Sequence, residues 1–202
     1  MSSYHEGILR MGMGEAMLAI DAAFLEWILA LPHPAWLNGI FLGASFAGRG
    51  AAIWLAAAAV LLFAAQISMR DAARLVLAIV MVHGVVDVAV KPWIDRPRPP
   101  LAIARIQPYA AVPDTRSFPS GHAANATAAA LVLSRVWRKA SVLVWAAAAV
   151  VGVARVYLGI HYPLDAVAGC AIGALCALVA LAVPMPPREP SSLQSHRITK
   201  NS

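Results

Sequence analysis

Charged side chains are scarce in this chain. Asp, Glu, Lys and Arg make up only 13% of its 202 residues, whereas 60% are hydrophobic and the mean hydropathy is +0.70. A soluble globular domain carries about 25% charged residues, so the composition predicts one membrane-embedded domain with no room for a second of similar size. The net charge of +6 is spread over loops and helix ends. Because it forms no basic stripe with interleaved aromatic residues, the chain is not expected to bind nucleic acid.

Cysteine is also scarce. Cys170 and Cys176 both lie in the last apolar segment, where six helical residues separate them by about 9 Å, too far for a disulfide. We expect two small buried hydrophobic side chains. Residues 1–14 lack the pattern of a cleaved signal peptide, so the first hydrophobic segment is expected to remain in the protein.

The apolar residues gather in runs of near-spanning length. A bilayer core takes about 20 helical residues, and five runs approach this length, at residues 49–67, 75–90, 119–137, 140–157 and 163–184. Residues 15–31 carry three carboxylates and precede Pro32 and Pro34, which predicts either one broken span or an interfacial helix followed by a span. The expected fold class is therefore all-α, a multi-pass transmembrane bundle of about six helices.

This reading divides the chain into three regions and gives it an orientation. Residues 1–48 hold interfacial or first membrane helices, 49–184 form the main membrane domain, and 185–202 are a disordered cytoplasmic tail. With six spans and a cytoplasmic N-terminus, three basic groups lie inside, as the positive-inside rule prefers. These groups are Arg70 with Arg74, Arg135 with Arg138 and Lys139, and Arg188 with Arg197 and Lys200.

One loop departs from that rule. Residues 91–118 fall on the outer side and yet hold five cations. Either the span count differs by one, or several of these cations bind an anion at the outer face. The five are Lys91, Arg96, Arg98, Arg105 and Arg116.

The tetrapeptide Pro119-Ser120-Gly121-His122 opens one predicted helix. Proline suits the first turn, and the free backbone N–H groups there form an anion site that the helix dipole reinforces. Gly121 lets the backbone approach a ligand, and His122 lies beside it in the first turn. Taken alone, the tetrapeptide is equally compatible with a polar histidine satisfied by water or a carbonyl group.

A histidine and an aspartate flank the start of the last helix. Pro163 marks that start, so His161 lies just outside the helix and Asp165 in its first turn. Asp165 can orient the imidazole through one nitrogen and leave the other free to attack. The alternative is a carboxylate that stabilises the helix dipole.

Three cations complete the pattern. Arg155 ends the preceding span, where an ionisable residue is functional unless it snorkels to the headgroups. Lys91 and Arg98 flank a proline-rich stretch that we expect to be non-helical. Arginine offers a planar fork and lysine a point charge for phosphate oxygens, and such groups stabilise the charge of a transferring phosphoryl group.

Together the three motifs resemble those of the type 2 phosphatidic acid phosphatases, a family related in fold and site to vanadium haloperoxidases and acid phosphatases. The family pattern is Lys-x6-Arg-Pro, Pro-Ser-Gly-His and Ser-Arg-x5-His-x3-Asp. Order and spacing match over roughly residues 50–183, and Ala154 stands where the family usually has serine, which puts one hydrogen bond in question. The matching residues are Lys91 to Arg98-Pro99, Pro119 to His122, and Arg155 with His161 and Asp165.

The resemblance implies a role for each matching residue and makes 49–184 the catalytic domain. His161 would be the nucleophile that forms a phosphohistidine, Asp165 its orienting partner, and His122 the general acid and then the base. No metal ion or cofactor is implied, because cationic side chains take the place of magnesium and the motif regions hold no further carboxylate cluster. The phosphoryl oxygens would be held by Lys91, Arg98, Ser120, Gly121 and Arg155.

Several neighbours of the motifs carry weaker expectations. Asp87 lies one helical turn before Lys91 and is expected to hold it by an ion pair, while His83, a turn earlier, is expected to make a buried polar contact. Trp93 and Tyr162 are expected to anchor the membrane interface. The remaining charged residues are predicted to contact a second phosphate or anionic headgroups (Asp95, Arg96 and Arg116) or to lie in a solvated loop (Arg105).

The predicted function is removal of the terminal phosphate from a lipid phosphate or diphosphate at the outer leaflet of the cell (inner) membrane, with polyprenyl diphosphate as the preferred substrate. Phosphatidic acid, phosphatidylglycerol phosphate and lipid A are alternatives. A non-catalytic lipid-phosphate binding or transport protein would need the cations but not His161 with Asp165. A vanadate-dependent peroxidase would suit the cationic site, but those relatives are soluble. The sequence does not indicate the oligomeric state.

Overall fold

The structure, a computed structural model, describes residues 13–184. Within this range all regular secondary structure is helical, which confirms the all-α expectation; the predicted tail at 185–202 lies outside the described residues. The elements are α2 (Met13–Ala30), α3 (Ala35–Ala47), η1 (Arg49–Ala51), α4 (Ala52–Phe63), α5 (Met69–His83), η2 (Gly84–Val90), α6 (Lys91–Ile94), α7 (Pro99–Ala102), α8 (Gly121–Val136), η3 (Arg138–Ala140), α9 (Ser141–Tyr157) and α10 (Pro163–Ala182).

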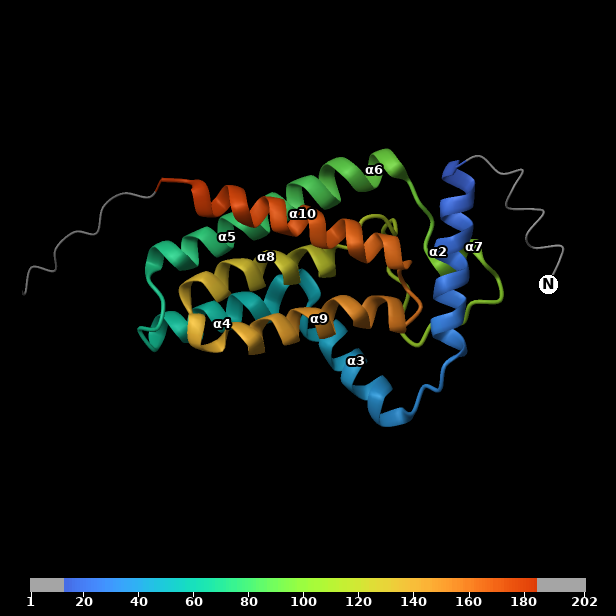
Figure 1. Ribbon diagram of the computed structural model, residues 1–202, viewed down its shortest axis with the longest axis horizontal. Coiled ribbons are helices and arrows are strands. Elements are labelled where there is room, and N and C mark those ends of the chain that lie inside the picture. Colours follow the sequence, from blue (N-terminus) through green and yellow to red (C-terminus); the bar gives the residue numbers. More distant parts are fainter. Residues whose placement is uncertain (1–12, 185–202) are drawn as a thin grey trace, which may run out of the picture.

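Helix α8 forms the centre of the bundle, and α5, α9 and α10 pack around it (Figure 1). Its surface is largely alanine, and small residues let membrane helices approach closely. A Cβ added at Gly173 of α10 would lie 2.1 Å from the carbonyl oxygen of Ala124, and one at Gly169 would lie 2.4 Å from that of Ser120. These two glycines therefore let the N-terminal halves of α8 and α10 lie side by side.

Three helical segments of the described chain are long and apolar enough to cross a membrane: Met69–Ala102, Arg138–Tyr157 and Pro163–Ala182. A fourth crossing results if α3 and the Arg49–Phe63 segment, which meet at 61°, form one broken span. Helix α8 has 16 residues, whereas a helix needs about 20 residues to cross a bilayer core. It occupies the interior of the bundle. The five apolar runs found in the sequence all fall on helices.

The bend between α3 and α4 comes from two consecutive residues in the left-handed region, Gly50 with φ 56° and Ala51 with φ 62°. Glycine adopts this conformation freely, whereas alanine does so only when surrounding packing holds it there. Ala51 is fully buried. The bend directs the end of α3 toward the start of α8, where Ser45 and Gly48 contact His122.

Helix α2 lies across the end of the bundle, transverse to α9 and α10 (Figure 1). Its inward side carries buried Asp21 and Leu25, and Leu25 packs in a cluster with Val156 and Tyr162. Its outward side is apolar and exposed, for example at Phe24 and Trp27. Helix α2 is not among the segments found long and apolar enough to cross a membrane, and an interfacial helix stays a prediction for residues 15–31.

Three local expectations were wrong. The helix begun at α5 continues through the π-helical η2 and through α6, so the stretch after Lys91 is helical to Ile94. Cys176 is buried, but Cys170 is exposed on the outer surface of α10. Tyr162 was expected at the membrane interface, and it is buried beneath the guanidinium group of Arg96, whose Cζ lies 3.8 Å from the ring centroid.

Candidate active site

The three sequence motifs meet at the end of the bundle that α2 crosses. A cavity of about 1460 Å³ opens there. Ser120 and Asp165 lie directly behind it, fully buried, and the Ser120 N–H donates to the carbonyl oxygen of Asp165 at 2.9 Å. The other six residues singled out from the sequence line this cavity: Lys91, Arg98, Gly121, His122, Arg155 and His161.

His161 lies in the tight connection between α9 and α10. Gly159 turns the chain with φ 73°, and a Cβ at this position would crowd Leu29 and Pro108. His161 is 2% exposed, and its Nδ1 lies 3.2 Å from Oδ2 of Asp165, which is 0% exposed. The backbone N–H of Tyr162 donates to the same oxygen at 2.9 Å, so the carboxylate and the imidazole are held in one fixed arrangement.

Arg98 determines which nitrogen of His161 carries the proton. Its Nη1 lies 3.0 Å from Nε2 of His161. Because a guanidinium group only donates hydrogen bonds, Nε2 must accept, and the ring proton resides on Nδ1, facing Asp165. The other donors of Arg98 bind the carbonyl oxygens of Ile160, Thr115 and Arg116 and the hydroxyl group of Thr115. Nε2 is therefore unprotonated, and its lone pair accepts a hydrogen bond from a fixed cation at the cavity wall.

Burial lowers the pKa of the His161 imidazole to about 4, and the nearby Arg98 and Arg155 cations lower it further while Asp165 opposes them. A ring with a lowered pKa is neutral above that pH and takes up its proton only as the pH falls through it. We predict that the labelled imidazole of His161, followed by NMR in micelles, stays neutral down to about pH 5. A midpoint near the unperturbed value of about 6.5 would contradict the buried environment described here.

His122 lies in the first turn of α8, whose N-cap is Ser120. Its Nε2 is 3.1 Å from the carbonyl oxygen of Ser45 on α3. Since a carbonyl only accepts, Nε2 carries its proton, and Nδ1 is the atom left free to exchange a proton with a ligand. Arg155, which is 4% exposed, donates to the Ser45 hydroxyl and leaves its Nε without a partner among the described residues. Ser45 thus connects the second and third motifs.

The absence of a side chain at Gly48 makes room for His122. A Cβ there would lie 3.1 Å from Cδ2 of His122 and 2.9 Å from Cγ1 of Val151. We predict that Gly48→Ala displaces the imidazole and lowers kcat by about 10- to 100-fold, because small misplacements of a reacting group are costly. Gly43→Ala is the matched control on the same helix, since a Cβ there meets nothing within 4 Å. Equal kcat values in both variants would contradict this prediction.

Lys91 is held as the sequence predicted. Its Nζ lies 2.6 Å from Oδ1 of Asp87, and Nδ1 of His83 lies 2.8 Å from the other oxygen. Asp87 lies inside the π-helical segment η2, and His83 and Lys91 flank its two ends; this helix type is often found at functional sites. A Cβ at Gly121 would lie 4.0 Å from the Lys91 ammonium, so the lysine stands next to the start of α8. The expectation of a buried His83 was wrong, because its side chain is 69% exposed.

The loop cations make ion pairs within the protein. Arg116 pairs with Asp95 at the cavity wall, and Arg105 with Glu26 at the surface. Arg96, predicted to contact a second phosphate or headgroups, instead donates to Oδ1 of Asp165 at 2.7 Å.

Two serines of the site went unrecognised in the sequence. Ser117 donates to Oδ2 of Asp165, and Ser45 lies between His122 and Arg155. Ser45 was detectable only as a polar residue inside an apolar helix, and Ser117 only by its place two residues before Pro119. Among residues 13–184, no three His, Cys, Asp or Glu side chains are grouped as metal ligands.

Comparison with known proteins assigns the chain to a family. The PAP2 superfamily matches residues 71–188 of the chain. Phosphatidylglycerophosphatase B of Bacillus subtilis (strain 168) is 27% identical over 173 residues, which cover 79% of this chain and 81% of the relative.

Two solved structures share the fold, each with a TM-score of 0.67. The first transmembrane PAP2 type phosphatidylglycerolphosphate phosphatase from Bacillus subtilis is 24% identical and is aligned over 82% of this chain and 85% of its own. Aquifex aeolicus LpxE is 26% identical, with 80% and 94% aligned.

The helical membrane fold and the relatives that share it define the protein as a membrane-embedded lipid phosphate phosphatase. It belongs to the PAP2 superfamily, whose match extends over more than half of the chain. This membership confirms the resemblance drawn from the three motifs.

Proposed function

We propose that the protein hydrolyses the terminal phosphate of a membrane lipid in two steps through a phosphohistidine at His161. The observation that carries the proposal is the arrangement around Nε2: an unprotonated nitrogen, oriented from behind by Asp165 at 3.2 Å, with a fixed arginine 3.0 Å away. A site that only binds lipid phosphates needs the cations, but it gains nothing from an oriented and neutral imidazole.

In the first step a phosphoryl oxygen replaces Nε2 as the acceptor of the Arg98 Nη1–H bond, and the Nε2 lone pair that this frees attacks phosphorus. The N–P bond forms and the bond from phosphorus to the lipid oxygen breaks. His122, which carries a proton on Nδ1 as well as on Nε2 once the anionic substrate is bound, gives the Nδ1 proton to the departing alkoxide. In the second step His122 takes a proton from water, the water oxygen attacks phosphorus, and the N–P bond breaks. Inorganic phosphate leaves, and both histidines return to their starting states. Asp165 stabilises the positive charge that develops on the His161 ring.

Two kinds of group bind the phosphoryl oxygens: cationic side chains and backbone N–H groups. Lys91, Arg98 and Arg155 supply positive charge at the cavity wall. The free backbone N–H groups at the N-terminus of α8, which follows Ser120 and begins at Gly121, form a preformed anion site. These groups stabilise the negative charge that spreads over the oxygens in the transition state, so the proposed reaction proceeds without a metal ion.

For the substrate we propose a glycerolipid phosphomonoester, phosphatidylglycerol phosphate. Support comes from the relative named phosphatidylglycerophosphatase B. The test measures phosphate release from a panel of lipid phosphates in detergent with a chelator present. Phosphatidylglycerol phosphate should show the highest kcat/KM, and chelation should not reduce it. Loss of activity on chelation would overturn the metal-independent mechanism, and a clear preference for another lipid would overturn this choice of substrate.

A polyprenyl diphosphate is the second candidate, and one observation favours it. Arg49 and Arg116 line the same cavity beyond the three cations assigned to the transferred phosphate, so a second phosphate has both space and charge. Arg49→Ala distinguishes the candidates. If a diphosphate is the substrate, this variant should lower kcat/KM for the diphosphate more than for a phosphomonoester. If a phosphomonoester is the substrate, the variant should change kcat/KM for both lipids by the same factor.

We further propose that the site faces outward from the inner membrane. The end of the bundle opposite the cavity holds the start of α5 and the segment η3 (Figure 1). Four basic residues lie in these segments, and the positive-inside rule assigns such an end to the cytoplasm. They are Arg70, Arg74, Arg138 and Lys139. A cysteine placed at the exposed Arg105 should react with a membrane-impermeant reagent in intact cells. Labelling only after lysis would reverse the orientation.

A further inference from the structure

An acidic residue of α2 binds the backbone next to Asp165, although it lies 144 residues earlier in the chain than Asp165 (165 − 21). Asp21 is 3% exposed, while most of α2 around it presents apolar side chains outward. Its Oδ1 accepts the backbone N–H of Leu164 at 2.9 Å, one residue before Asp165. Helix α2 lies outside residues 71–188, the part of the chain that matches the PAP2 superfamily. The fold therefore adds a charged group to the site from a segment that the family match does not include.

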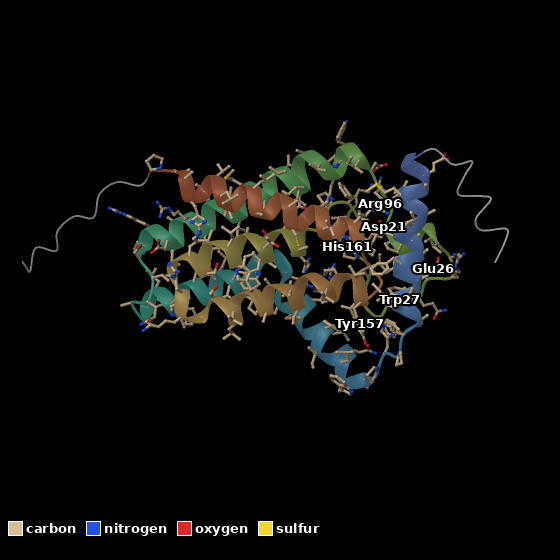
Figure 2. All side chains as sticks on the ribbon, viewed as in Figure 1. Asp21, Glu26, Trp27, Arg96, Tyr157 and His161 are labelled. Carbon is tan, nitrogen blue, oxygen red and sulfur yellow. The ribbon has the colours of Figure 1, made fainter. Side chains whose placement is uncertain are left out.

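Arg96 connects Asp21 with Asp165. Its Nη1 donates to Oδ1 of Asp165 and its Nη2 to Oδ2 of Asp21, both at 2.7 Å. The guanidinium plane also lies over the ring of Tyr162. Figure 2 shows Asp21 and Arg96 close to His161 at the end of the bundle that α2 crosses. Arg96 is thus held between two buried carboxylates, an arrangement that only the planar fork of arginine can satisfy.

We infer that Asp21 and Arg96 are positioning residues for the nucleophile and act through Asp165; this inference rests on the proposed role of His161. The Oδ2 atom of Asp165 accepts hydrogen bonds from His161, Ser117 and the Tyr162 N–H, whereas Oδ1 accepts one from Arg96 alone within residues 13–184. A carboxylate bound at one oxygen can rotate about that contact, and binding of the second oxygen fixes its plane. The plane of Asp165 in turn fixes the direction of the Nδ1–H bond and hence the aim of Nε2.

The variant Asp21→Asn tests this directly. Asparagine has the shape of aspartate and can still accept the Leu164 N–H, so α2 keeps its anchor while Arg96 loses its counter-charge. We expect kcat to fall by about 10- to 100-fold, the usual effect of removing a supporting partner behind a catalytic ligand. KM should stay within about twofold, because Lys91, Arg98 and Arg155 are untouched. Inorganic phosphate as a competitive inhibitor should keep its inhibition constant.

Glu26→Gln is the matched control. Glu26 lies on the same helix, five residues after Asp21, and pairs with Arg105 at the surface. It should leave kcat and KM unchanged. If Glu26→Gln lowers kcat as much as Asp21→Asn does, the effect belongs to the seating of α2 and the inference is wrong. Arg96→Lys provides a second variant that keeps the charge but not the fork, and it should show the same split, with kcat reduced and KM kept.

A double-mutant cycle separates positioning from general stability. In an Asp165→Asn background, Asp21→Asn should cause little further loss, because the carboxylate it supports is already gone. Additive losses would show that Asp21 acts independently of Asp165 and would overturn the inference. If the proposed function itself is wrong, a different result is expected: Asp165→Asn alone retains the full wild-type kcat. If Asp21→Asn does not fold, Arg96→Lys in the same background decides the question by the same criterion.

Discussion

His161→Ala lowers kcat for a lipid phosphate by about 10⁴-fold or more, the scale seen when a catalytic nucleophile is deleted. The loss is this large because Nε2 forms the covalent bond in the proposed mechanism, and the neighbouring side chains bind or orient but do not attack. Phosphate release from the purified protein in detergent measures it. KM should change much less, since the cations of the cavity remain.

Two controls make this result interpretable. The variant should elute as the wild type does in gel filtration, which checks that truncation of this buried side chain leaves the protein folded. His33→Gln should retain activity, since His33 is stacked on Tyr109, lies at a tilt against Tyr157, and is not among the residues that line the cavity. A folded His161→Ala protein with more than about a tenth of the wild-type kcat would exclude the nucleophilic role.

His122→Ala lowers kcat for a lipid phosphate by about 10³-fold, within the range of general acid–base catalysis. A lipid alkoxide is a poor leaving group, so the first step needs the proton that His122 supplies. With an aryl phosphate such as p-nitrophenyl phosphate, the leaving group is a stable phenolate that departs without protonation. With that substrate the variant should release close to one equivalent of nitrophenol per enzyme in a burst and then turn over slowly, because the second step still lacks its base.

The burst is the diagnostic feature, because it separates a role in proton transfer from a role in phosphate binding. If His122 only bound phosphate, both substrates would be affected alike and no burst would appear. The His33→Gln protein should show neither the kcat loss nor the burst.

The motifs were predictable because their chemistry is local. Pro163 starts α10, Ser120 caps α8, and the spacing between His161 and Asp165 spans the start of a helix, so the contact between them follows from helix geometry. The ion pair between Lys91 and Asp87 follows in the same way from a four-residue spacing on one helix face. The convergence of the three motifs was inferred from their match to a family pattern, which encodes tertiary contacts that spacing alone does not.

Contacts between distant segments escaped the sequence analysis. Arg96 was assigned to a phosphate or to headgroups, because a cation in a loop has many potential partners and its spacing does not choose among them; it binds Asp165, 69 residues away. Ser45 is 110 residues from Arg155, and its role depends on the bend at Gly50 and Ala51. Burial of His83 and Tyr162 was misjudged for the same reason, since exposure depends on which helix covers a residue.

The most direct measurement follows the phosphorus atom itself. p-Nitrophenyl phosphate labelled with ³²P, whose first step does not need the proton of His122, is reacted with the His122→Ala protein; the reaction is quenched in alkaline detergent, and the labelled residue is located by mass spectrometry. The mechanism predicts one phosphoryl group on His161, stable to alkali and lost in acid, and none in the His161→Ala protein. Label on another residue, or rapid phosphate release with no protein-bound label at any time, would contradict it.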